Sequence, residues 1–201
     1  LRIILRDIYR NGLYKNMKGI DLIIRPLSLK DINSNYVSWF SDNVVTKYLD
    51  AKNISILESQ KYLRNGIINR SYYIYAICEK KNKKHIGNIK IGPIRRIDGV
   101  SDLVTVIGDK NYWGKGLATQ ALKLIINKSF AEGGLRKFCA SIDSNNQGSF
   151  NAYLKAGFKL EATLKKYFLH DSYISKNYSD KLYVTIDNLE YDIEKFRKWE
   201  P

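Results

Sequence analysis

The chain has little cysteine: Cys78 and Cys139 are the only two among its 201 residues. Each lies inside an apolar, strand-like run, where a free cysteine behaves as a small hydrophobic side chain. We therefore expect two buried free thiols rather than a disulfide framework. The same pattern predicts no metal site.

Long apolar runs are also missing. No stretch approaches the roughly 20 apolar residues that cross a bilayer, and the first residues lack the apolar core of a signal peptide. Because 44% of the residues are hydrophobic and 12% are aromatic, the composition favours one cytoplasmic domain with a substantial core.

Methionine occurs once, at Met17, just before the first strand-like run at residues 22–25. We interpret residues 1–16 as an N-terminal extension, either upstream translated sequence or a recombinant remnant, and residues 17–201 as the working domain. The alternative is a short amphipathic helix on Ile3, Ile4, Ile8 and Tyr9.

Acidic residues are few, with 20 against 34 basic residues and a net charge of +14. Clustered lysine and arginine bind nucleic-acid backbones, so that class of partner must be weighed. However, short basic pairs such as Lys80-Lys81 and Lys165-Lys166 are spread along the chain, without a nucleic-acid-binding motif. A solvated basic surface that attracts small anionic ligands is the favoured interpretation.

Strand and helix patterns alternate from Leu22 onward. The predicted strands cover residues 22–26, 73–79, 85–94, 103–108, 137–143, 158–168 and 181–186. Ser28 with Asp31, and Ser55 with Glu58, predict two helix starts. Further helices are expected from residue 117 to Gly133-Gly134, over residues 147–156, and around Ile193. This order predicts an α/β (α+β) fold, with a mixed, mostly antiparallel sheet flanked by helices.

A glycine-rich turn joins the strand at residues 103–108 to the next helix. Gly114 and Gly116 leave room for an anion beside a helix N-terminus, so a phosphorylated ligand is predicted. A Walker loop is excluded, because five residues separate Gly108 from Gly114 and Gly116 occupies the hydroxyl position. A dinucleotide fingerprint is disfavoured, because Thr119 stands where the third glycine belongs.

Residues 113–118 resemble the pyrophosphate loop of the GNAT acyltransferases, Gln/Arg-x-x-Gly-x-Gly/Ala, except at Trp113. Residues 146–158 resemble a second GNAT signature, Asn-x-x-Ser/Ala followed by Tyr-x-Lys-x-Gly-Phe. Residues 85–94 and 112–116 are similar to the branch that includes ribosomal-protein N-terminal acetyltransferases and bacterial surface-sugar acetyltransferases. The resemblance covers residues 21–186 and implies a GNAT fold whose strands splay at the cofactor site.

The resemblance implies acetyl-CoA as the cofactor. Pantetheine would pair with the backbone around Val106, Ile107 and Asp109. The pyrophosphate would bind the loop and helix start formed by Trp113, Gly114, Lys115, Gly116, Leu117, Ala118 and Thr119. Asn146 and Ser149 would contact the cofactor arm.

Acetyl transfer requires a polarised carbonyl, a deprotonated amine and protonation of the departing thiolate. The motif places Tyr153 as the general acid, and a phenol with a pKa of about 10 suits a thiol of about 8.5. The alternative for Tyr153 is core packing, with Ser149 as the substitute donor. Asp109 is the candidate base, Asp143 and His85 are alternatives, and an acceptor amine of low pKa would need no base.

The expected acceptor is a small molecule carrying a primary amine, and a nucleotide-linked aminosugar in surface-glycan synthesis fits this branch. Its stacking partners are sought among Tyr36, Trp39, Phe40, Tyr48, Tyr72 and Tyr73, with Arg95 or Arg96 for phosphates. A protein N-terminus, as in the ribosomal-protein acetyltransferases, is the alternative acceptor. A silent CoA-binding or nucleic-acid-associated module is a further alternative, and a homo-oligomer is compatible with each.

Overall fold

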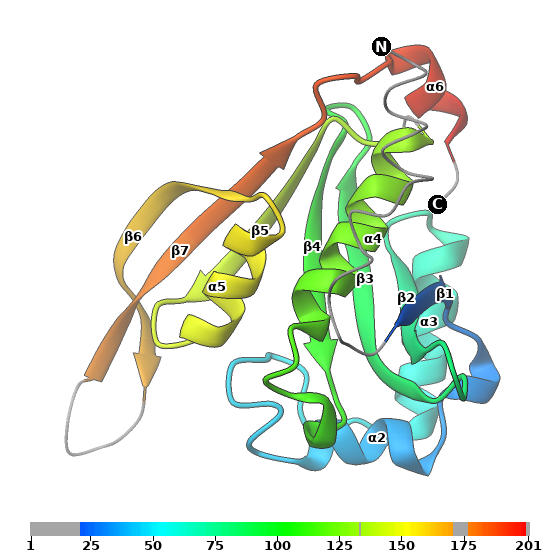
Figure 1. Ribbon diagram of the computed structural model, residues 1–201, viewed down its shortest axis with the longest axis vertical. Helices are drawn as coiled ribbons and strands as arrows, with labels where there is room; N and C mark the ends of the chain where they lie inside the picture. Colours follow the sequence, from blue (N-terminus) through cyan, green and yellow to red (C-terminus); the bar gives the residue numbers. More distant parts are fainter. Residues whose placement is uncertain (1–20, 133, 171–176, 200–201) are drawn as a thin grey trace.

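The computed structural model describes residues 21–132, 134–170 and 177–199, which form a seven-stranded sheet in the order β1-β2-β3-β4-β5-β7-β6 (Figure 1). The interpretation of residues 1–16 and the expected stop at Gly133 lie outside these ranges. The strands are β1 (Leu22–Pro26), β2 (Tyr73–Glu79), β3 (His85–Arg95), β4 (Val100–Ile107), β5 (Lys137–Asp143), β6 (Lys159–His170) and β7 (Asn177–Asp187). Among the described strands, β4 and β5 alone pair in parallel, which confirms the mostly antiparallel sheet.

The helices of the described residues are α2 (Ser34–Ser41), α3 (Ile56–Ile68), α4 (Leu117–Ala131), α5 (Gln147–Lys155) and α6 (Ile193–Lys198), with 3-10 turns η1 (Leu29–Asp31) and η2 (Lys110–Tyr112). Ser55 and Glu58 form the predicted capping box of α3. Among the described helices, none has the length and apolarity that a membrane crossing requires.

The helix predicted to start at Ser28 and Asp31 is only a three-residue 3-10 turn. Ser28 and Asp31 cap only η1, and α2 begins after Asn33, whose side chain accepts the Tyr36 N–H. Asp31 also accepts two hydrogen bonds of 2.7 Å from the Arg25 guanidinium. Asp31 therefore ties the turn to β1 instead of opening a longer helix.

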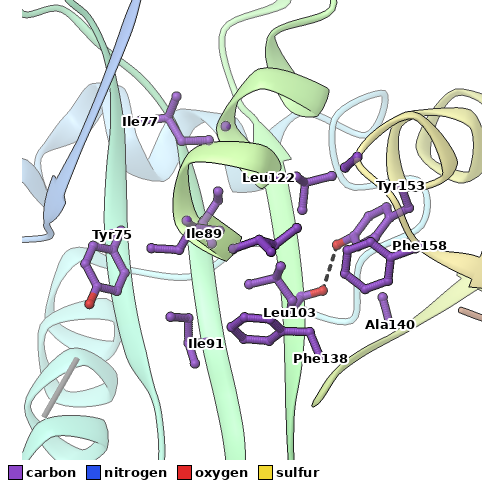
Figure 2. Close-up of a cluster of buried hydrophobic side chains, with 14 of the residues drawn as sticks. Tyr75, Ile77, Ile89, Ile91, Leu103, Leu122, Phe138, Ala140, Tyr153 and Phe158 are labelled. Atoms are coloured by element: carbon purple, nitrogen blue, oxygen red, sulfur yellow. Dashed lines mark hydrogen bonds between the residues drawn. The ribbon is translucent and has the colours of Figure 1, made fainter. Parts of the chain in front are cut away.

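Two hydrophobic cores lie on opposite faces of the sheet, because strand side chains alternate between its faces. Tyr75 and Ile77 of β2 belong to the core packed against α4 (Figure 2), whereas Ala76 and Cys78 belong to the core that includes α2 and α3 residues. Cys78 and Cys139 are buried and free, as predicted. The sheet therefore separates an α4/α5 face from an α2/α3 face.

Candidate active site

β4 and β5 separate after a short stretch of pairing (Figure 1). Residues 100–102 of β4 pair with residues 137–139 of β5, but residues 103–107 pair only with β3. At about 3.3 Å per residue, this leaves roughly 16 Å of β4 backbone facing β5 without strand partners. Polar backbone groups there need other partners. We call this opening, between residues 103–107 and 140–143, the wedge.

The loop beyond β4 has the geometry of an anion cradle. Gly114 and Gly116 both have φ of 73°, a left-handed conformation that favours glycine. Gly116 is the N-cap of α4 and supplies no side-chain cap, so the first N–H groups of the helix have no partner within it. A Cβ atom at Gly114 would meet nothing within 4 Å. The loop, residues 113–119, therefore presents backbone amides to open space, and we call it the cradle loop.

Most side chains of the cradle loop are occupied elsewhere. The Trp113 indole N–H donates to the Ile107 carbonyl at 2.7 Å, which ties the loop to the end of β4. The Thr119 hydroxyl donates to the Ala152 carbonyl at 3.3 Å and joins α4 to α5. Lys115 is exposed, with its ammonium 5.5 Å from the centre of the Tyr112 ring. Backbone amides therefore dominate the loop's capacity to bind an anion.

The start of α5 lies just after β5, beside the wedge. Asn146 caps α5, because its side-chain oxygen accepts the Ser149 N–H at 3.2 Å. Asn146 and Ser149 are half-buried, as are Val106 and Ile107 on the β4 side. The structure thus places the predicted arm-binding residues on both borders of the wedge.

Tyr153 of α5 reaches into the wedge from the α4/α5 face (Figure 2). Its side chain is 4% exposed, and its hydroxyl donates to the Leu103 carbonyl at 2.7 Å. Burial raises the pKa of Tyr153 well above that of a free phenol, and the Thr105 hydroxyl and backbone oppose this only in part. The residue is therefore both a core side chain and a protonated hydroxyl beside the unpaired edge of β4.

Asp109, the candidate base, is engaged by two neighbours. Its carboxylate accepts the Asn111 N–H at 3.0 Å and forms a 2.8 Å ion pair with Lys84. Burial alone would raise the pKa of Asp109, but the bonds from Lys84 and Asn111 lower it overall. A stabilised carboxylate is a weaker proton acceptor. This geometry suits a turn cap better than a base.

The two alternative bases are also engaged. Asp143 forms a 2.7 Å contact with His170 and accepts the Asn145 N–H at 2.8 Å. His85 places Nε2 2.9 Å from the Gly87 carbonyl and 3.0 Å from the Asn88 side-chain oxygen. Burial is the main cause of a lowered pKa at His85, so its ring is neutral near pH 7. Neither contact set aims a free proton acceptor into the wedge.

An open depression of about 420 Å³ lies between α2 and the end of β4. Its charged residues are paired, Asp42 with Lys110 at 2.5 Å and Asp109 with Lys84. The complete lining is Asn35, Ser38, Trp39, Asp42, Lys84, Gly108, Asp109, Lys110 and Asn111. We call it the acceptor depression, because it is lined by Trp39, one of the aromatic residues considered for the acceptor side.

Gly108 lies in the acceptor depression, and a side chain packs closely on its backbone there. A Cβ atom at Gly108 would lie 2.1 Å from the Trp39 ring, so the indole packs directly on the backbone there. Of the six aromatic residues proposed for the acceptor side, Trp39 is the one that lines the described depression, and Tyr36 and Phe40 are buried in the second core. Arg95, which was considered for phosphate binding, forms an ion pair with Asp98. It is the last residue of β3, whereas Lys84 of the depression precedes the first. The polar residues Asn35, Ser38 and Asp42 carried no motif that could have identified them.

Family comparison extends over most of the described chain. A model described as an acetyltransferase (GNAT) domain matches residues 21–159. Spermidine N(1)-acetyltransferase of Escherichia coli (strain K12) is 31% identical over 171 residues, which cover 84% of this chain and 87% of that protein. A probable N-acetyltransferase of Bacillus subtilis (strain 168) is 26% identical over 161 residues, covering 75% and 87%.

Two further proteins resemble the chain, one in sequence over a shorter segment and one in its solved fold. Ribosomal-protein-serine acetyltransferase of Escherichia coli (strain K12) is 31% identical over 114 residues, 56% of this chain and 63% of that protein. The crystal structure of spermidine N-acetyltransferase from Vibrio cholerae, in complex with CoA and spermine, superposes with a TM-score of 0.71 at 19% identity. It covers 85% of this chain and 97% of that one, so the two folds are the same.

Proposed function

As a member of the GNAT acetyltransferase family, the chain is an acetyl-CoA-dependent N-acetyltransferase, and we propose that its acceptor is the primary amine of a nucleotide-linked aminosugar. The single observation that carries the acceptor proposal is the lining of the acceptor depression. It combines uncharged hydrogen-bonding side chains, an indole and two lysines that are held by carboxylates.

The wedge and the cradle loop fit acetyl-CoA. The β4 backbone at Val106 and Ile107 borders the wedge, where an amide-containing chain can pair as a strand would. The amides around Gly114 and Gly116 are suited to a diphosphate. When bound, acetyl-CoA supplies a thioester whose acyl carbon is open to attack by an amine.

Tyr153 is proposed as the general acid. Its burial keeps the phenol protonated at neutral pH, and its hydroxyl already lies on the β4 edge, at the Leu103 carbonyl. Such a group can protonate a departing thiolate. Ser149, half-buried at the start of α5, is the substitute donor in this proposal.

The acceptor depression suits a sugar better than a polyamine. Asn35, Ser38 and Asn111 offer donors and acceptors to sugar hydroxyls, and Trp39 offers an apolar surface. Spermidine is the substrate named for one relative. A polyamine would have to displace Lys110 from Asp42 and Lys84 from Asp109, and the net charge of +14 would repel it.

A protein N-terminus is the second candidate acceptor. The open shape of the acceptor depression also admits a peptide. Ribosomal-protein-serine acetyltransferase is among the relatives, although the similarity spans 63% of that protein. A peptide would enter the same depression without needing the uncharged hydrogen-bonding side chains that suit a sugar.

A thiol-release assay with acetyl-CoA tests these acceptors side by side. Nucleotide-linked aminosugars, spermidine and N-terminal peptides are offered at equal concentration, and the aminosugars are expected to give the highest kcat/KM. The Asn35→Ala/Ser38→Ala double variant should raise the KM of the acceptor and leave that of acetyl-CoA unchanged. Asn65→Ala, on the exposed side of α3, is the matched control. Preference for spermidine or peptides would overturn the aminosugar proposal.

Self-association is proposed as well. β6 is an edge strand of the described sheet and exposes Leu160, Leu164, Tyr167 and Leu169. A fold neighbour from Vibrio cholerae, with a TM-score of 0.64, was solved as a dodecamer. Light scattering of the full chain measures its mass in solution, and a purely monomeric mass would contradict this proposal.

A further inference from the structure

An acceptor amine that is protonated near pH 7 must lose a proton before it can attack the acyl carbon, and this inference rests on the proposed function. The three groups considered from the sequence are occupied: Asp109 by Lys84 and a turn, Asp143 by His170, and His85 by two oxygen atoms. The proton acceptor must therefore be sought elsewhere along the wedge.

Asp102 stands at the closed end of the wedge. It is the last β4 residue that pairs with β5, opposite Cys139. The next residue, Leu103, holds the Tyr153 hydroxyl through its carbonyl. Adjacent strand side chains point to opposite faces, and Leu103 lies in the core on the α4/α5 face. The Asp102 side chain therefore lies on the opposite face, where it is half-buried and Val104 is 38% exposed.

We propose that the Asp102 carboxylate accepts the proton of the attacking amine, from the sheet face opposite to Tyr153. The amine nitrogen loses one proton to Asp102 and forms a C–N bond with the acyl carbon. The C–S bond breaks, and its electron pair leaves with sulfur, which takes a proton from the Tyr153 hydroxyl. Proton exchange with water then restores the carboxylate and the phenol.

The surroundings of Asp102 leave its carboxylate available. Lys90 of β3 and Lys181 of β7 attract the Asp102 carboxylate through space. The Lys90 ammonium lies 3.2 Å from the Tyr62 hydroxyl, and the Lys181 ammonium lies 4.4 Å from the centre of the Tyr167 ring. Both lysines are thus held by aromatic side chains. No hydrogen bond from a described residue contributes to the charge state of Asp102.

The pKa shifts of Asp102 and Tyr153 favour a base on one face of the sheet and an acid on the other. Burial raises the pKa of Asp102, and Lys90 and Lys181 oppose this. The negative charge of Asp102 helps to raise the pKa of Tyr153, after burial as the main cause. The other titratable neighbours, Cys139 and Tyr183, have raised pKa values and are neutral. A carboxylate with a raised pKa and a protonated phenol are matched to opposite proton transfers.

The decisive variant is Asp102→Asn, assayed with the amine that gives the highest thiol release with the wild-type protein. We expect kcat to fall roughly 100-fold or more and the Kd of acetyl-CoA to remain unchanged. The wild-type kcat/KM should rise with pH as Asp102 ionises. In Asp102→Asn, the midpoint of this rise in kcat/KM should shift to the pKa of the acceptor amine, because hydroxide or water must then remove the proton. Asp102→Glu should restore part of kcat.

Asp98→Asn is the matched control, because it removes the same charge from the exposed turn before β4. It should keep both kcat and the pH profile. A wild-type kcat and pH profile in Asp102→Asn would overturn the proposal, as would a change confined to the KM of the acceptor. Because the assay uses whichever amine is active, rejection of the aminosugar acceptor leaves this test intact. A carboxyl carbon NMR titration measures the pKa of Asp102 without turnover. A value at or below about 3.9 for Asp102 would contradict the proposal.

Discussion

At the residue scale, the Tyr153 hydroxyl combines a structural and a chemical role. Tyr153→Phe removes the donor to the Leu103 carbonyl, so the free energy of unfolding should fall by about 1 kcal/mol. It also removes the proposed proton donor, and kcat should fall roughly 100-fold. Steady-state kinetics and isothermal titration with acetyl-CoA measure the two effects separately.

Tyr75→Phe is the control for that variant. Tyr75 is a buried tyrosine of the same hydrophobic core but belongs to β2, away from the wedge (Figure 2). It should leave kcat unchanged. If Tyr153→Phe retained the wild-type kcat, the hydroxyl would have only its structural role.

The sequence predicted the identity of the proposed acid better than that of the base. Tyr153 belongs to a local motif, so its position on a helix followed from spacing. Its hydrogen bond to Leu103 joins residues 50 positions apart, which local periodicity does not specify. Asp102 carried no motif, and its importance depends on Lys90, Lys181 and the point where β4 leaves β5. Such non-local surroundings appear only in the folded chain.

At the element scale, the cradle loop depends on the backbone of Gly116. Gly116→Glu adds bulk, a negative charge and strain at a φ of 73°. The carboxylate would occupy the amides offered to a diphosphate, so the Kd of CoA should rise at least 10-fold. Isothermal titration measures this, and the melting temperature reports folding.

Gly116→Asn separates charge from strain, because asparagine tolerates the left-handed conformation and caps helices well. It should bind CoA more tightly than Gly116→Glu does. Equal, wild-type affinity in both variants would show that the amides around Gly116 do not hold the diphosphate.

The strands were predictable because alternation is local, and β2 and β5 have the predicted ends. Other boundaries moved because tertiary contacts decide them. Ser28 and Asp31 carried a helix-start pattern, yet Arg25 of β1 holds Asp31 and restricts the cap to η1. The separation of β4 from β5 was implied only by family resemblance, because it depends on what packs between the strands.

At the scale of the whole molecule, the link between β1 and η1 connects the sheet to the second core. Asp31 accepts hydrogen bonds from Arg25 and from the Ser28 backbone at 2.8 Å. Burial alone would raise the pKa of Asp31, but these bonds hold it well below its usual range. A carboxyl group with a lower pKa in the folded chain stabilises it fully above the unfolded pKa of about 3.9. That stability is lost as pH falls through the folded pKa.

Asp31→Asn should therefore lower the free energy of unfolding by roughly 1.5 kcal/mol near pH 7. The difference from wild type should narrow as the pH falls from about 4 toward 2.5, because protonation removes the same interaction from the wild-type chain. Urea unfolding at a series of pH values measures this difference. Asp98→Asn, which changes a more exposed carboxylate paired with Arg95, should show a smaller difference at every pH. A constant difference for Asp31→Asn between pH 7 and the acid limit would mean that Asp31 contributes through packing rather than through its charge.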